Sequence, residues 1–163
     1  MSRPFLARLP VIAIAGIAML AAGACFGLTA PAIDGTLLDL IWTGPAAEAR
    51  LAEMDQASRT AHFWTTLIID TAYPLAYGAF LAGLAARFAP ARFARLAMVP
   101  AALVVLLDLV ENTAQMMALK GAGDVLWLKT FVTPAKFGMF AAAALLAGIL
   151  GLLALARFAL RNR

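Results

Sequence analysis

The chain has little of what several familiar redox and hydrolytic chemistries require. Its 163 residues include one histidine, His62, and one cysteine, Cys25. A single histidine excludes bis-histidine haem ligation and a histidine-rich zinc site. A single cysteine excludes an intramolecular dithiol exchange centre. No serine lies within the long apolar stretches described below, which excludes a Ser–His protease embedded in them. We expect no haem and no zinc, and the fold requires no cofactor.

Charged residues are scarce too, at 13% of the chain against 64% hydrophobic residues. This composition lies far outside the range of a soluble domain. Four apolar stretches are long enough to cross a hydrocarbon core about 30 Å thick, which takes about 20 helical residues. They lack the period-2 alternation of barrel strands. The sequence predicts an all-α, polytopic membrane protein, a four-transmembrane-helix bundle in a single domain over residues 1–163, with spans at about 10–30, 63–86, 93–119 and 133–157.

The basic residues are unevenly distributed among the segments outside the spans. Arginines gather at the N-terminus, in the second connection and at the C-terminus: Arg3, Arg8, Arg87, Arg92, Arg95, Arg157, Arg161 and Arg163. The first connection is instead acidic. The positive-inside rule therefore predicts that both termini are cytoplasmic. It also accounts for the net charge of +4 without a nucleic-acid partner. Ten arginines against three lysines, with abundant alanine, favour a GC-rich bacterium and thus a multi-pass protein of its inner membrane.

The first span has two interpretations. A basic N-terminus, an apolar run and small residues before Cys25 also form the pattern of a lipoprotein signal. The residue three positions before the cysteine is a weak match, and the apolar run continues to Pro31. We therefore expect an uncleaved helix.

The first connection, residues 31–61, is too long for a tight turn. Within it, "TGPAAEARLAEMDQAS" places Ala47, Leu51 and Met54 on one helical face. This pattern predicts a short amphipathic helix in the outer loop.

The third span contains polar residues that lipid would penalise. Its sequence "LVVLLDLVENTAQMM" carries, within an arc of about 100°, Asp108, Glu111, Asn112 and Gln115. On an insertion scale an aspartate near a helix centre costs about 2.5–3.5 kcal/mol, whereas each large apolar residue returns about 0.3–0.6 kcal/mol. The two carboxylates therefore offset most of the apolar gain of this span. We expect the stripe to face the interior of the bundle.

Polar residues of two other spans are expected at the same depth. Asp70, Tyr73 and Tyr77 share a face of the second span, and Lys136 lies near the start of the fourth. With a rise of about 1.5 Å per residue, all lie in the outer half of the bilayer, level with the stripe of the third span. Convergence of three helices on one polar layer is the main functional signal in the sequence.

Two prolines modify the predicted spans. Pro74 cannot donate to the carbonyl four residues earlier, so the freed carbonyl of Asp70 is expected beside the Asp70 carboxylate. Pro134 follows Thr133, an arrangement favoured at helix starts. Thr133 is therefore predicted as the N-cap of the last span.

These groups predict an acidic polar pocket open to the periplasmic side. Three carboxylates face one lysine, so protons, a bound cation or water must compensate the excess charge. The predicted pocket residues are Asp70, Tyr73, Tyr77, Asn112, Gln115 and Lys136, with Asp108 and Glu111 as the candidate catalytic pair. Asp70, Asp108 and Glu111 are also the candidate ligands of a divalent cation, Mg²⁺ or Ca²⁺, because these ions prefer oxygen ligands.

Three classes of function remain open. The leading one is a pocket that binds a cation, a cationic amine or the headgroup of a membrane lipid. A second is a membrane-embedded enzyme acting on a lipid, with the carboxyl pair as acid and base and a tyrosine as donor. A third is an accessory subunit that assembles with another membrane protein or with copies of itself. The structural alternative is that the polar residues only form contacts between helices.

Overall fold

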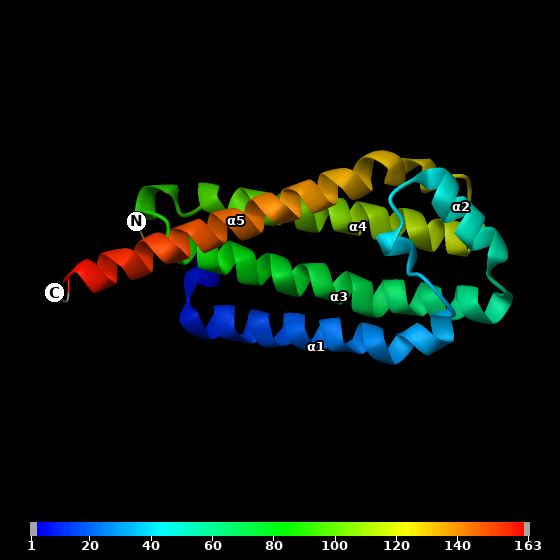
Figure 1. Cartoon of the computed structure of the whole chain (residues 1–163), viewed down its shortest axis with the longest axis horizontal. Coiled ribbons are helices and arrows are strands. Elements are labelled where there is room, and N and C mark those ends of the chain that lie inside the picture. The colour runs from blue at the N-terminus through cyan, green and yellow to red at the C-terminus, as the bar shows by residue number, and fades with distance from the viewer. Residues whose placement is uncertain (1–2, 162–163) are drawn as a thin grey trace.

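The computed structural model describes residues 3–161, which are helical with short connections and contain no strand (Figure 1). The α-helices are α1 (Leu9–Ile33), α2 (Gly44–Glu53), α3 (Gln56–Phe88), α4 (Val99–Leu119) and α5 (Lys129–Arg161). Short 3₁₀ helices η1 (Phe5–Ala7), η2 (Leu38–Leu40), η3 (Ala91–Phe93), η4 (Leu96–Met98) and η5 (Leu126–Leu128) lie in the connections. The all-α prediction is confirmed. Arg163, part of the predicted basic C-terminus, lies outside the described residues.

Four helical segments are long enough and apolar enough to cross a membrane: Leu9–Ile33, Gln56–Phe88, Leu96–Leu119 and Leu126–Arg161. The last two join η4 to α4 and η5 to α5. Large apolar side chains cover their outward faces, including Leu20 and Leu28 on α1 and Leu152 and Leu155 on α5. Polar residues within these helices, among them Asp70, Asp108 and Glu111, are instead buried. This distribution is the reverse of that in an ordinary soluble bundle.

The last helix starts earlier than its sequence predicts. Thr133 is an interior residue of α5, which begins at Lys129, and Pro134 lies inside the helix. The prediction that Thr133 caps the helix is therefore wrong. The additional turn brings Lys129 and Thr133 onto the face that meets α4, so tertiary contacts described below outweigh the local preference of a Thr-Pro pair for a helix start.

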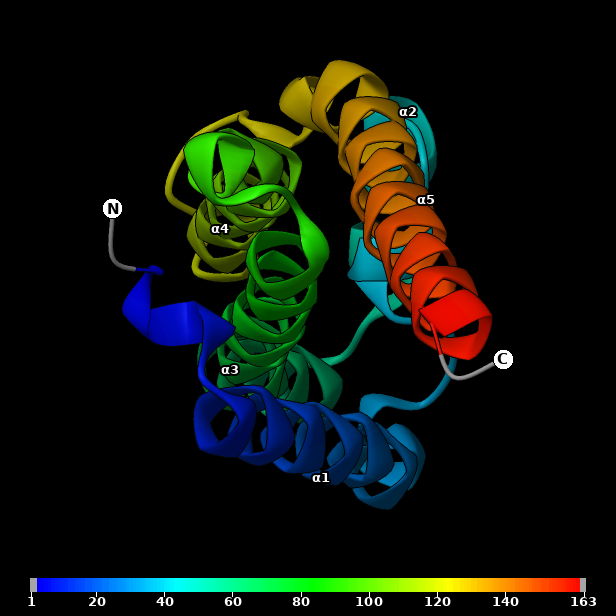
Figure 2. The same cartoon turned by 90° about the vertical axis from the view of Figure 1, so that its left-hand side faces the viewer.

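The central helix is α3, which packs against α1, α4 and α5, as the end-on view shows (Figure 2). Between α3 and α4 the approach is close at Gly78, where a Cβ atom would overlap the Val105 side chain. Helix α5 also packs against α4, whereas α1 and α5 have no extensive contact with each other in the described part of the chain. The bundle is thus a three-helix unit of α3, α4 and α5 with α1 attached to α3.

The two ends of the bundle differ in charge. Both described ends of the chain and the α3–α4 connection lie at one end, where Arg87 donates to the Ala7 carbonyl at 3.2 Å (Figure 1). Helix α2 lies at the opposite end, with Ala47 and Met54 buried. The predicted amphipathic helix in the first connection is therefore present, and its apolar face is packed rather than free.

Helix α3 begins beside α2 with a side-chain cap. Asp55 precedes its first turn and accepts a hydrogen bond from the Ser58 backbone N–H at 2.7 Å. Such caps satisfy one of the free N–H groups of a helix start. This hydrogen bond holds the pKa of the exposed Asp55 carboxyl below its usual range.

Candidate functional site

Glu111 on α4 is the centre of a group of buried charges that form ion pairs with one another. Its side chain is 1% exposed. Its Oε1 atom accepts from Lys129 Nζ and from Thr133 Oγ1, and its Oε2 atom lies 2.6 Å from Lys136 Nζ. The three partners follow one another on α5 at positions i, i+4 and i+7, the spacing of one helical face. We call these four residues the Glu111 cluster.

Lys136 connects the Glu111 cluster to two aspartates. Besides Glu111, its ammonium group bonds Asp39 Oδ1 and lies 3.5 Å from Asp108 Oδ1. Asp39 comes from η2, in the connection between α1 and α2. Three carboxylates, one from η2 and two from α4, thus surround one ammonium group.

Asp108 is held from its other side by a tyrosine. The Tyr77 hydroxyl donates to Asp108 Oδ2 at 2.6 Å. The Tyr77 ring meets the edges of Tyr73 and Phe140, with centroids 5.3 and 5.2 Å away. Tyr73 in turn packs against Phe26 of α1 at 5.7 Å. An aromatic layer therefore lies directly beside the acidic one.

Asp70 on α3 differs from the other buried carboxylates. It is 4% exposed, yet within residues 3–161 no side chain hydrogen-bonds its carboxylate or forms an ion pair with it. Its backbone carbonyl, which Pro74 leaves without a helical partner, accepts from Asn112 Nδ2 at 2.6 Å. Asn112 thus supplies the hydrogen bond that the helix cannot give to this carbonyl.

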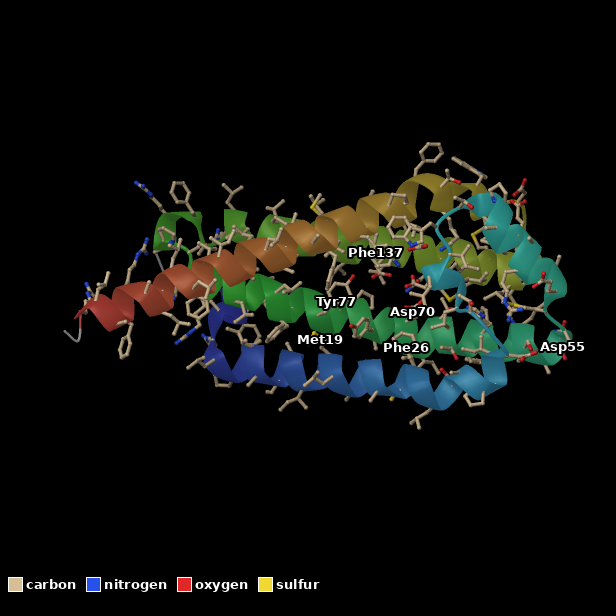
Figure 3. All side chains as sticks on the ribbon, in the orientation of Figure 1. Met19, Phe26, Asp55, Asp70, Tyr77 and Phe137 are labelled. Atoms are coloured by element: carbon tan, nitrogen blue, oxygen red, sulfur yellow. The ribbon has the colours of Figure 1, made fainter. Side chains whose placement is uncertain are left out.

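A cavity of about 190 Å³ lies between α3, α4, α5 and η2. Its lining residues are Asp39, Asp70, Tyr73, Tyr77, Asp108, Lys136, Phe137 and Phe140. Figure 3 shows Asp70 and Tyr77 on α3 and Phe137 on α5 in the middle of the bundle. Trp42, which follows η2, stacks on Phe137 with ring centroids 5.1 Å apart. We call this space the acidic cavity.

Five of the eight residues predicted from sequence line the acidic cavity: Asp70, Tyr73, Tyr77, Asp108 and Lys136. Glu111 lies behind Lys136, and Asn112 reaches only the backbone of Asp70. Gln115 is fully buried away from the cavity, where neither of its amide atoms has a hydrogen-bond partner. The structure thus divides one predicted polar stripe into separate environments.

The carboxylates that could share a cation are Asp39, Asp70 and Asp108, each of which offers an oxygen within 4.8 Å of the others. Glu111, which the sequence suggests as a ligand, faces two lysines instead. The whole site contains four buried or half-buried carboxylates and two lysines, so a formal charge of minus two remains. Uncompensated buried charge is costly, so this excess calls for a positively charged partner or protons.

The site contains residues that the sequence prediction lacks: Asp39, Phe137 and Phe140 in the cavity lining, Lys129 and Thr133 in the Glu111 cluster, and His62. Lys129 shares a helical face with Thr133 and Lys136, a spacing that identifies it once the helix is extended by one turn. His62 is fully buried, and its Nε2 accepts from the Leu38 backbone N–H at 3.1 Å. This hydrogen bond fixes the position of η2 and thereby of Asp39. No local sequence pattern predicts the hydrogen bond.

Comparisons with protein-family models, curated proteins and solved structures find no match for this chain. The geometry of the site itself therefore carries the functional interpretation.

Proposed function

We propose that this chain is a small integral protein of a bacterial inner membrane. Its four long apolar helices and their apolar outward faces support insertion. The arginine-rich end of the bundle, which carries both described chain ends, would face the cytoplasm, and the α2 end the periplasm. In this orientation the acidic cavity lies in the periplasmic half of the bilayer.

The function that the site supports best is binding of a positively charged ligand in the acidic cavity. The observation that carries this proposal is the Asp70 carboxylate, which is buried, faces the cavity and has no protein partner. Asp39 and Asp108 lie beside it and add to the negative potential. A cation in the cavity would supply the missing partner of Asp70 and reduce the excess charge.

Interhelical contact alone explains Asp70 poorly. Polar side chains that hold membrane helices together do so by bonding across the helix interface. Glu111 does this with three partners from α5, whereas the Asp70 carboxylate bonds none. An unpaired carboxylate of this kind weakens a bundle unless a ligand or a bound proton compensates it.

The test is thermal melting of the full chain in an uncharged maltoside detergent, with and without MgCl₂, CaCl₂ or hexylammonium chloride. We expect at least one cation to raise the wild-type melting temperature, by about 5–10 °C at a ligand concentration of about 100 Kd. Asp70→Asn should melt at or above the ligand-free wild type, because it removes an unpaired charge, and should lose the shift.

Asp124→Asn is the matched control, since Asp124 is exposed in the α4–α5 connection. This variant should keep the full cation-dependent shift. A wild type that no cation stabilises would overturn the proposal. If Asp70→Asn then also melts several degrees lower, Asp70 is a structural residue.

A second candidate function is a membrane-embedded acid–base enzyme acting on a lipid. It is favoured by two carboxyl groups, Asp70 and Asp108, that face one cavity, and by the Tyr77 hydroxyl 2.6 Å from Asp108. Such a pair can donate and accept protons in one reaction. An enzyme would convert the bound molecule, whereas a binding protein would return it unchanged when the ligand is recovered and analysed by mass spectrometry.

A further inference from the structure

The walls of the acidic cavity differ in what they offer a cation. Charge alone does not separate a divalent metal ion from an organic ammonium group, since either would reduce the excess of minus two. The lining does separate them. Both carboxylates and aromatic rings line the cavity. We call Asp39, Asp70 and Asp108 its carboxylate wall, and the rings of Tyr73, Tyr77, Phe137 and Phe140 its aromatic wall.

The carboxylate wall has few free oxygens for a metal ion. Both oxygens of Asp108 are engaged, one by the Tyr77 hydroxyl and one by the Lys136 ammonium 3.5 Å away. Asp39 also bonds Lys136. Asp70 alone has both oxygens free, whereas Ca²⁺ takes six to eight oxygen ligands and Mg²⁺ six in near-octahedral geometry. A metal ion would have to displace Lys136 or keep most of its water.

The aromatic wall suits an organic ammonium group. Aromatic faces attract ammonium groups and can replace their water, as in the aromatic cages that recognise alkylated amines. They offer nothing to Mg²⁺, which dehydrates reluctantly. The cavity already shows this contact, because Lys136 Nζ lies 5.1 Å from the Phe137 ring centroid. One free carboxylate in a cavity also lined by aromatic rings is therefore a better match for a second ammonium group.

The cavity is covered toward α2 but open at its side. Toward α2 it is bounded by Asp39 and by the stack of Trp42 on Phe137. On its side, Phe140 lines the cavity and is 37% exposed. Phe140 belongs to α5, and α5 and α1 both pack on α3 without extensive contact with each other in the described chain (Figure 2). In the proposed orientation, that opening faces lipid.

On the basis of the proposed function, we infer that the ligand is an alkylammonium group on an apolar tail, which enters the acidic cavity sideways between α1 and α5. The ammonium would bond Asp70 and contact Phe140, and the tail would remain in the apolar opening. An aminolipid such as phosphatidylethanolamine and a free amphipathic amine share this chemistry. The ammonium nitrogen of either molecule would take the same position.

The first arm of the test compares probes in the melting assay. Hexylammonium chloride should stabilise the wild type at concentrations at least tenfold lower than methylammonium chloride, because its methylenes gain apolar contact. Equal potency of the two amines would overturn entry with a tail. If MgCl₂ or CaCl₂ stabilises the protein and neither amine does, this inference fails while the proposed function stands. If no cation acts, both fail.

The second arm separates the two sources of the amine. Wild type and Asp70→Asn are reconstituted in phosphatidylglycerol vesicles with or without phosphatidylethanolamine. An Asp70-dependent rise in melting temperature with phosphatidylethanolamine supports a lipid headgroup. A response to hexylammonium but not to this lipid supports a free amine. A response to the lipid that survives in Asp70→Asn would overturn the inferred site.

The third arm tests the aromatic wall with matched variants. Phe140→Leu keeps an apolar side chain but removes the ring, and should weaken hexylammonium binding about threefold to tenfold. Phe158→Leu is the control on the same helix, since Phe158 is exposed far from the cavity. The ligand-free melting temperature shows whether each variant is folded, and Phe137→Leu provides a second ring deletion. Unchanged binding in both ring variants would overturn the role of the aromatic wall.

Discussion

Glu111 and Asp70 are both buried carboxylates on neighbouring helices, yet they differ in the partners that surround them. Glu111 is surrounded by Lys129, Thr133 and Lys136, whereas the Asp70 carboxylate faces a cavity without a partner. Burial therefore does not by itself indicate function. The presence or absence of partners divides the polar layer into a part that holds the helices together and a part available to a ligand.

The largest effect is expected when Glu111 is neutralised. In Glu111→Gln, Lys129 loses the carboxylate it bonds, and within the described residues no second one is bonded to it. Leaving a buried charge unpaired costs about 3–5 kcal/mol. Chemical denaturation of the variant should therefore show a loss of this size, whereas Asp70→Asn should show none.

The matched test of this pairing is the double variant Glu111→Gln/Lys129→Met, which removes both charges and should recover much of the lost stability. A double variant as unstable as the sum of its single changes would contradict the pairing. Such a result would mean that Glu111, like Asp70, does not depend on a charged partner.

A smaller effect is expected at Asn112. A change at this residue tests the backbone carbonyl of Asp70 independently of its carboxylate. Asn112→Leu removes the donor to the Asp70 carbonyl that Pro74 leaves free. An unsatisfied buried acceptor costs about 1–3 kcal/mol. In a Pro74→Ala background the helix can satisfy that carbonyl itself, so the same change should cost less there. Equal losses in the two backgrounds, measured by denaturation, would show that Asn112 acts in another way.

The smallest effect is expected at Asp55, a carboxylate outside the bundle that serves as a reference for the two buried ones. Its pKa is lowered in the folded state by the Ser58 backbone N–H. The cap therefore contributes stability above the unfolded pKa, near 3.8, and this contribution is lost as the pH falls through the lower, folded value. Asp55→Asn keeps an acceptor but does not titrate. Melting curves from pH 6 to pH 3 should show a small wild-type advantage that disappears in acid, and an advantage that grows in acid would contradict this assignment.

The sequence predicts best what depends on spacing along one helix. The long apolar helices follow from composition, and the environment of the Asp70 carbonyl follows from Pro74 four residues later. Asp39 could not be predicted in the same way. Its contact with Lys136 spans 97 positions and depends on the His62–Leu38 bond, which leaves no periodic signal. Lys129 could not be predicted because Pro134, a residue favoured at helix starts, indicated that the helix begins after Lys129.

Helix α5 has a further consequence because of its length. Its 33 residues extend for about 50 Å, whereas the hydrocarbon core of a bilayer is about 30 Å thick. In a membrane such a helix must tilt or project, and its tilt depends on the local thickness of the bilayer. Lys129 and Lys136 lie in its first turns and are bonded to Glu111 on α4. Lipid chain length sets bilayer thickness. We therefore expect a change in lipid chain length to alter the ion pairs that border the acidic cavity.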